Sequence, residues 1–66
     1  MCLSTVYERK NGAETLVLND VCTLSAEEGR VTVTDIMGEK AVVSGMVKSV
    51  DLMRNIIFVE AADLPG

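Results

Sequence analysis

Two residues at the start of the sequence bring together the densest set of metal donors in the chain. Cys2 directly follows Met1, so that a thiol lies beside the chain's amino group and its first amide nitrogen. A cysteine binds a metal as its thiolate. The alternative is that Cys2 is a small apolar residue that begins a strand. The residue types alone leave both interpretations open. The metal-ligand interpretation predicts a specific geometry.

A metal bound at Cys2 is expected to have planar coordination. If Met1 is removed, the amine and thiolate of Cys2 close a five-membered ring, and two such termini in a dimer supply two nitrogens and two sulfurs. If Met1 is retained, its amine, the Cys2 amide nitrogen and the thiolate form two fused rings with one open corner. Planar sites with nitrogen donors are typical of Ni(II) and Cu(II), whereas zinc prefers a tetrahedral site. Both geometries therefore favour Ni(II) or Cu(II).

The other candidate residues have simpler interpretations. The sequence has no histidine, which excludes imidazole ligands and the histidine-dependent nucleophilic mechanisms. We expect Cys22 to be a small buried residue, with a second metal ligand as the minor alternative. Met37, Met46 and Met53 are expected to pack in the core or in an interface rather than to bind copper. Because no catalytic set is present, we expect a protein that is not an enzyme.

The length and net charge of the chain limit the kinds of protein that it can be. The 66 residues predict one domain over residues 1–66, and a domain of this size is only marginally stable alone. Hydrophobic residues make up 48% of the chain, and self-association would cover the excess apolar surface. The net charge of −4, the scattered Lys and Arg residues and the near absence of aromatic residues argue against nucleic-acid binding. Since neither a signal peptide nor a membrane-spanning segment is recognised, we expect a cytoplasmic protein without membrane contact.

The elements that must position Cys2 are short strands. Alternating apolar and polar residues, separated by turn residues, predict six strands over residues 3–8, 14–19, 21–26, 31–36, 41–51 and 56–60. Asn11-Gly12 favours a tight hairpin, Gly45 is expected to mark a bulge or a barrel corner, and Asp51 and Asn55 are expected to cap the last turn. The pattern predicts an all-β fold, a small SH3-like or Sm-like antiparallel barrel whose first and last strands are edges for a homodimer.

With these residues in view, the chain resembles the CooT family, small nickel-binding accessory proteins of carbon monoxide dehydrogenase maturation. The resemblance extends over nearly the whole chain and is carried by Met1-Cys2, the strand that ends in Tyr7, Asn11-Gly12, Asp-Ile-Met-Gly-Glu at 35–39, Lys-Ser-Val-Asp-Leu at 48–52, and Ile57. It implies a homodimeric SH3-like barrel without enzymatic activity, which binds Ni(II) through Cys2 near the dimer axis. It also implies a role in nickel delivery or storage, with the dehydrogenase or its maturation machinery as partner.

The chain departs from the family's pattern at one position. Related sequences often carry a histidine in the hairpin after the Asp-Leu pair, and Asn55 stands at the matching position here. The resemblance therefore implies that Cys2 and the chain terminus supply most of the nickel coordination.

Two alternatives stay open beside this resemblance. The HypC family of hydrogenase maturation chaperones also begins Met-Cys-Leu and forms small barrels, and its terminal cysteine serves iron-centre assembly and partner docking. The Gly-Ile-Pro run that typically follows in that family is replaced here by Ser4-Thr5-Val6. The other alternative is a metal-free protein-interaction barrel, in which Cys2 is structural or redox-active. Titration with Ni(II) distinguishes the metal-free alternative from a nickel-binding protein.

Overall fold

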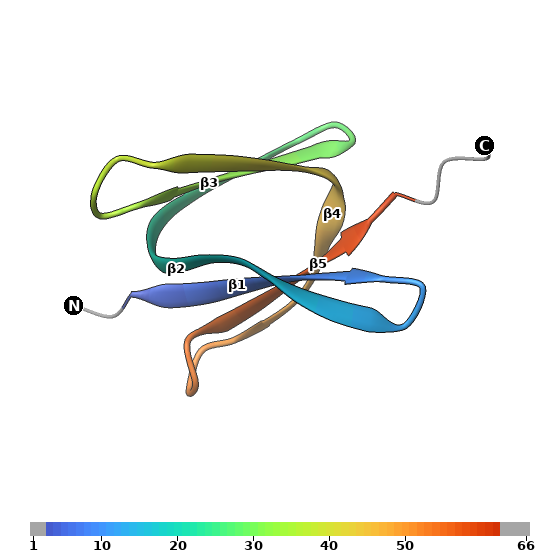
Figure 1. The fold of residues 1–66 in the computed structure, drawn as a ribbon, viewed down its shortest axis with the longest axis horizontal. Coiled ribbons are helices and arrows are strands. Elements are labelled where there is room, and N and C mark those ends of the chain that lie inside the picture. The colour runs from blue at the N-terminus through green and yellow to red at the C-terminus, as the bar shows by residue number, and fades with distance from the viewer. Residues whose placement is uncertain (1–2, 63–66) are drawn as a thin grey trace.

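Five strands close into a barrel in the computed structural model, which describes residues 3–62 (Figure 1). They are β1 (Ser4–Lys10), β2 (Ala13–Glu27), β3 (Arg30–Asp35), β4 (Lys40–Asp51) and β5 (Ile56–Ala61). Strands that follow each other in the chain pair antiparallel, and parallel pairing of β1 with β5 closes the ring. The prediction of a small all-β barrel is confirmed. Since β1 and β5 are bonded to each other, they do not offer the free edges expected for dimerisation by strand pairing.

The second and third predicted strands are a single bent strand, β2. Its bend lies at Asp20, which has a φ of 54°. Before the bend β2 pairs with β1, and after it β2 pairs with β3. A positive φ at one residue redirects the strand without ending its ladder. The six predicted strands therefore become five, because Asn19-Asp20 carries the same local signal for a bend as for a turn.

Two glycine-containing positions behave as predicted. Asn11 and Gly12 have φ angles of 52° and 81°, which make a tight two-residue hairpin between β1 and β2. Gly45 has a φ of 155°, and a Cβ at this position would collide with the backbone carbonyl oxygen of Glu60. The pairing of β4 changes from β3 to β5 at Gly45. Gly45 is therefore a barrel corner, as expected.

The core is small and aliphatic. Its buried side chains are Val6, Val21, Val31, Val33, Val43, Ile57 and Val59. The two aromatic residues point outward, because side chains alternate between the two faces of a strand and Val6 and Val59 take the inner face. The rings of Tyr7 and Phe58 stack with their centroids 5.8 Å apart, and Arg9 covers the Phe58 ring at 5.3 Å.

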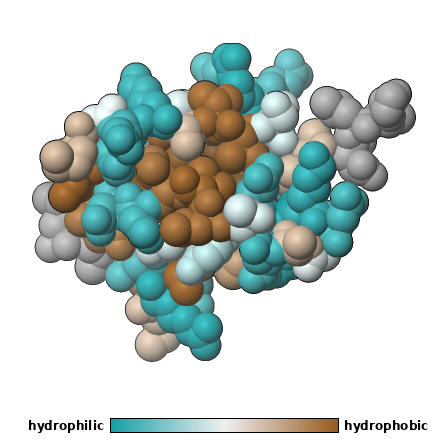
Figure 2. Space-filling model, in the orientation of Figure 1, coloured by the Kyte–Doolittle hydropathy of each residue, from teal (hydrophilic) through white to brown (hydrophobic). Residues whose placement is uncertain are grey.

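Part of the apolar content remains at the surface. Figure 2 shows apolar side chains gathered at the centre of one face of the molecule, with hydrophilic residues around them. Within residues 3–62, no helix is long and apolar enough to cross a membrane.

Candidate functional site

The predicted metal ligand, Cys2, lies outside residues 3–62, so its coordination stays a prediction. The structure does place the start of β1, two residues further along the chain. Ser4 pairs with Val21 of β2, and Thr5 pairs with Ile56 of β5. The chain therefore enters the barrel between β2 and β5.

Two turns flank the start of β1. The β4–β5 turn is bonded to it directly, because the Thr5 amide donates to the Asn55 carbonyl oxygen at 2.9 Å. The β3–β4 turn is bonded to the bend in β2, because the Ile36 amide donates to the Asp20 carbonyl oxygen at 3.1 Å. Asp20 adjoins the residue that pairs with Ser4. Figure 1 shows both turns at the end of the barrel that carries the N label. We call this end, made of the start of β1, the bend in β2 and the two turns, the N-terminal face.

The two turns are built in the same way. Asp35 Oδ1 accepts hydrogen bonds from two backbone amides of its own turn, each at 2.9 Å, and Asp51 Oδ1 accepts two at 3.1 Å. An aspartate that accepts hydrogen bonds from the backbone ahead of it fixes a turn. The predicted capping of the turn is confirmed for Asp51. Asn55 ends the turn with a φ of 57°. Each aspartate is followed by an apolar pair, Ile36-Met37 in the first turn and Leu52-Met53 in the second.

These apolar pairs are exposed. The exposed fractions are 56% for Ile36, 82% for Met37, 81% for Leu52 and 95% for Met53. Met46, on the outer face of β4, is 66% exposed. The three methionines therefore do not pack in the protomer core, because two lie in turns and the third points away from the barrel interior. Packing in an interface, the other alternative, stays a prediction. The repeated sequence Asp-Ile-Met and Asp-Leu-Met could have indicated these exposed pairs. Large apolar residues are uncommon in turns, so a turn that contains two of them is unusual.

Cys22 is also exposed, contrary to the expectation of a buried residue. The pairing of β2 with β3 shifts between Val21 and Thr23, so that Cys22 is an extra residue in a bulge. Its thiol donates to the Asp35 carbonyl oxygen at 3.5 Å. The expectation that Cys22 points inward assumes a regular ladder along β2. Because a bulge interrupts the ladder at Cys22, the alternation of faces does not hold there.

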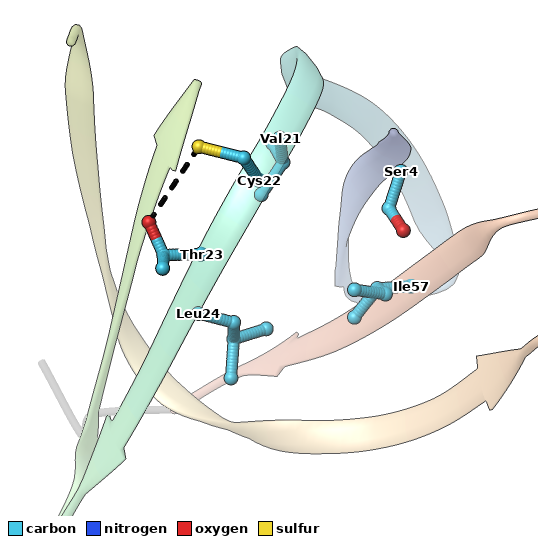
Figure 3. A pocket seen from close by; sticks show the side chains of 6 residues that line it. All are labelled: Ser4, Val21, Cys22, Thr23, Leu24 and Ile57. Carbon is cyan, nitrogen blue, oxygen red and sulfur yellow. Dashed lines mark hydrogen bonds between the residues drawn. The ribbon is translucent and has the colours of Figure 1, made fainter. Parts of the chain in front are cut away.

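A pocket of about 120 Å³ lies beside Cys22 on the N-terminal face (Figure 3). It is lined by Ser4, Val21, Cys22, Thr23, Leu24 and Ile57. The sulfur of Cys22 points toward the Thr23 hydroxyl, at 3.8 Å, and away from Ser4 and Ile57. The pocket contains no charged side chain, so that its walls provide little to bind a metal cation.

The described part of the chain does not hold a complete set of metal ligands. Within residues 3–62, no three side chains of His, Cys, Asp or Glu gather closely enough to bind one metal ion. The predicted ligand Cys2 lies two residues before Ser4 in the sequence.

Residues 1–60 match the family described as CO dehydrogenase accessory protein CooT. The crystal structure of a protein assigned as CooT from Carboxydothermus hydrogenoformans has the same fold, with a TM-score of 0.82 and 24% sequence identity over 94% of this chain and 100% of that chain. Comparison with curated proteins gives no significant match. The structural match supports the fold, and the family match also includes Met1-Cys2.

Proposed function

The chain belongs to the CooT family of CO dehydrogenase accessory proteins, and on that premise we propose that it binds Ni(II) as cargo through Cys2. The observation that carries the proposal is the family match over residues 1–60, which includes Met1-Cys2. The protein would hold nickel for the dehydrogenase or its maturation machinery and would not itself catalyse a reaction. Its placement in the cytoplasm stays a prediction from the sequence.

The residues around the N-terminal face offer few alternatives to Cys2 as a metal ligand. The other cysteine, Cys22, lies on β2. Its thiol donates to the Asp35 carbonyl oxygen and points away from Ser4 and Ile57, which line the neighbouring pocket. Histidine is absent from the whole chain. Thiolate and terminal amine are therefore the donors we propose, and together they suit planar Ni(II).

We further propose that nickel is shared by two copies of the chain. One terminus with Met1 removed supplies one nitrogen and one sulfur, which fill half of a square-planar site. Two termini complete it. This geometry requires one nickel per dimer, whereas the alternative with Met1 retained requires one nickel per chain. Mass spectrometry of the native protein reports whether Met1 is present, and the bound stoichiometry distinguishes the two geometries.

Nickel titration of the untagged protein tests the proposal. We expect thiolate charge-transfer and planar d–d absorption bands to grow with added Ni(II) in the native protein. Cys2→Ser should weaken nickel binding by at least about 100-fold, because the only proposed sulfur ligand is lost. The matched control is Cys22→Ser, which removes the other thiol and should leave the spectra and the affinity unchanged.

The same titration at several pH values probes the thiolate. Because protons compete with nickel for the Cys2 sulfur, affinity should decrease as the pH is lowered. An N-terminal extension should change the spectra, because it converts the terminal amine into an amide. If Cys2→Ser binds nickel as tightly as the native protein, the proposed site is wrong. If the native protein does not bind nickel, a metal-free interaction barrel becomes the better interpretation.

A further inference from the structure

The first half of β4, before its corner at Gly45, has an edge that no strand of residues 3–62 covers. A strand has two edges, and residues 40–44 of β4 pair with β3 along one of them. Pairing with β5 begins only at Gly45 and continues toward Asp51. The edge of residues 40–43 that faces away from β3 is therefore open within the described range. An open edge is a template for another extended segment.

Two hydrogen bonds show which backbone groups face this edge. The Gly45 amide donates to the Gly29 carbonyl oxygen at 3.0 Å, on the side of β3. The Ala62 amide donates to the Ser44 carbonyl oxygen at 2.7 Å, on the opposite side. Because backbone groups alternate between the two edges of a strand, the N–H and C=O of Val42 face the same side as those of Ser44. Val42 thus presents one donor and one acceptor to the open edge.

We propose that residues 63–66 continue β5 along this open edge of β4. Gly45 pairs with Ala61, and Ser44 is bonded to Ala62, so that the same register places Leu64 opposite Val42. In this register the Leu64 amide donates to the Val42 carbonyl oxygen. The Val42 amide in turn donates to the Leu64 carbonyl oxygen. The occupant of the edge is therefore the segment that directly follows β5.

The residue types of the segment fit this register. Residues opposite each other in an antiparallel pair place their side chains on the same face. Val42 is 59% exposed on the outer face, and Leu64 covers its side chain in this arrangement. Pro65 lacks an amide hydrogen and falls where that hydrogen would face away from β4. Proline is tolerated in an edge strand at such a position.

The inference concerns a part of the chain that lies beyond the family match, which ends at residue 60. It depends neither on nickel nor on Cys2. Its consequence is that the segment occupies backbone groups of β4 that could otherwise pair with an extended segment of another protein. Residues 63–66 therefore act as a cover for one edge of the barrel.

Amide hydrogen exchange, measured residue by residue by NMR on the untagged protein, tests the proposal. Deletion of residues 63–66 should accelerate exchange of the Val42 amide by at least about tenfold, because this amide loses its proposed acceptor. The Val43 amide is the internal control. It faces β3, by the same alternation, and should exchange at an unchanged rate.

Two substitutions test the register. Leu64→Pro removes the amide that is proposed to donate to Val42, and it should accelerate Val42 exchange as strongly as the deletion does. Pro65→Ala is the matched control, because it adds an N–H that faces away from β4. Exchange of the Val42 amide in this variant should stay within about twofold of the native rate.

The outcomes separate this inference from the nickel proposal. A Val42 amide that exchanges at the same rate with and without residues 63–66 overturns the inference. Acceleration by the deletion but not by Leu64→Pro overturns the register. If circular dichroism shows that the deletion variant does not fold, Leu64→Pro and Pro65→Ala give the same comparison in the full chain. None of these variants changes Cys2, so that the nickel titration succeeds or fails independently.

Discussion

Position 45 has no space for any side chain larger than the hydrogen atom of glycine. Gly45 is the corner at which β4 leaves β3 and joins β5, and its backbone approaches the Glu60 carbonyl oxygen too closely for a Cβ. Its amide donates to the Gly29 carbonyl oxygen at 3.0 Å, which fixes the corner from the other side. The collision is with backbone, so that it cannot be relieved by a side-chain rotation.

Gly45→Ala should therefore lower the free energy of unfolding by about 3 kcal/mol, since both the backbone conformation and the packing oppose the new methyl group. Gly12→Ala is the control, because Gly12 also has a positive φ but has open space around its Cα. The control should lose only about 1 kcal/mol. Urea denaturation measures both, and equal losses would show that the Glu60 carbonyl oxygen is not the obstacle.

At the scale of the elements, the β3–β4 and β4–β5 turns repeat one construction. In each, an aspartate Oδ1 holds two backbone amides and an apolar pair follows. The β3–β4 turn is further bonded through the Asp35 amide, which donates to the Glu39 carbonyl oxygen at 2.9 Å. The aspartates thus set the shape of the N-terminal face, and the apolar residues set its surface chemistry.

Asp35→Ala should destabilise the protein by about 1–2 kcal/mol, because two amides of the turn lose their acceptor. Asp35→Asn keeps an oxygen at the same position and should lose less than about 0.5 kcal/mol. Amide hydrogen exchange at Met37 and Glu39 should accelerate in the alanine variant only. Equal exchange in both variants would mean that the carboxylate oxygen does not hold the turn.

At the scale of the whole molecule, the barrel has a small core, and eight large apolar side chains among residues 3–62 are exposed. Seven buried aliphatic side chains are few for a folded domain, and the four ion pairs within residues 3–62 are at the surface. Exposed ion pairs contribute little to stability. We therefore expect association to supply part of the stability that the isolated barrel lacks.

Thermal unfolding should depend on protein concentration, because unfolding of a dimer releases two chains. A tenfold increase in concentration should raise the Tm of the native protein. Nickel at 100 times its Kd should add about 2.7 kcal/mol to the native protein if it binds only the folded state. A native Tm independent of concentration would indicate that the folded monomer is stable alone.

Several features of the fold depend only on residues that are close together in the chain. The sequence by itself determined these features. The alternation of residues predicted the strands, Asn11-Gly12 predicted the hairpin, and Gly45 predicted the corner, because each depends on local backbone preferences. The family resemblance likewise rests on segments read in order. The donors crowded at Met1-Cys2 are also visible in the sequence, although their coordination stays a prediction because Cys2 lies outside residues 3–62.

Only the tertiary structure decided which residues share the N-terminal face. The start of β1, the bend at Asp20 and the two turns are far apart in the chain, and they meet because β1 pairs with β5 and β2 bends from β1 to β3. The exposure of Cys22 has the same origin, since its direction depends on a bulge set by the register with β3. Long-range pairing fixes these positions, and local residue preferences do not contain that information.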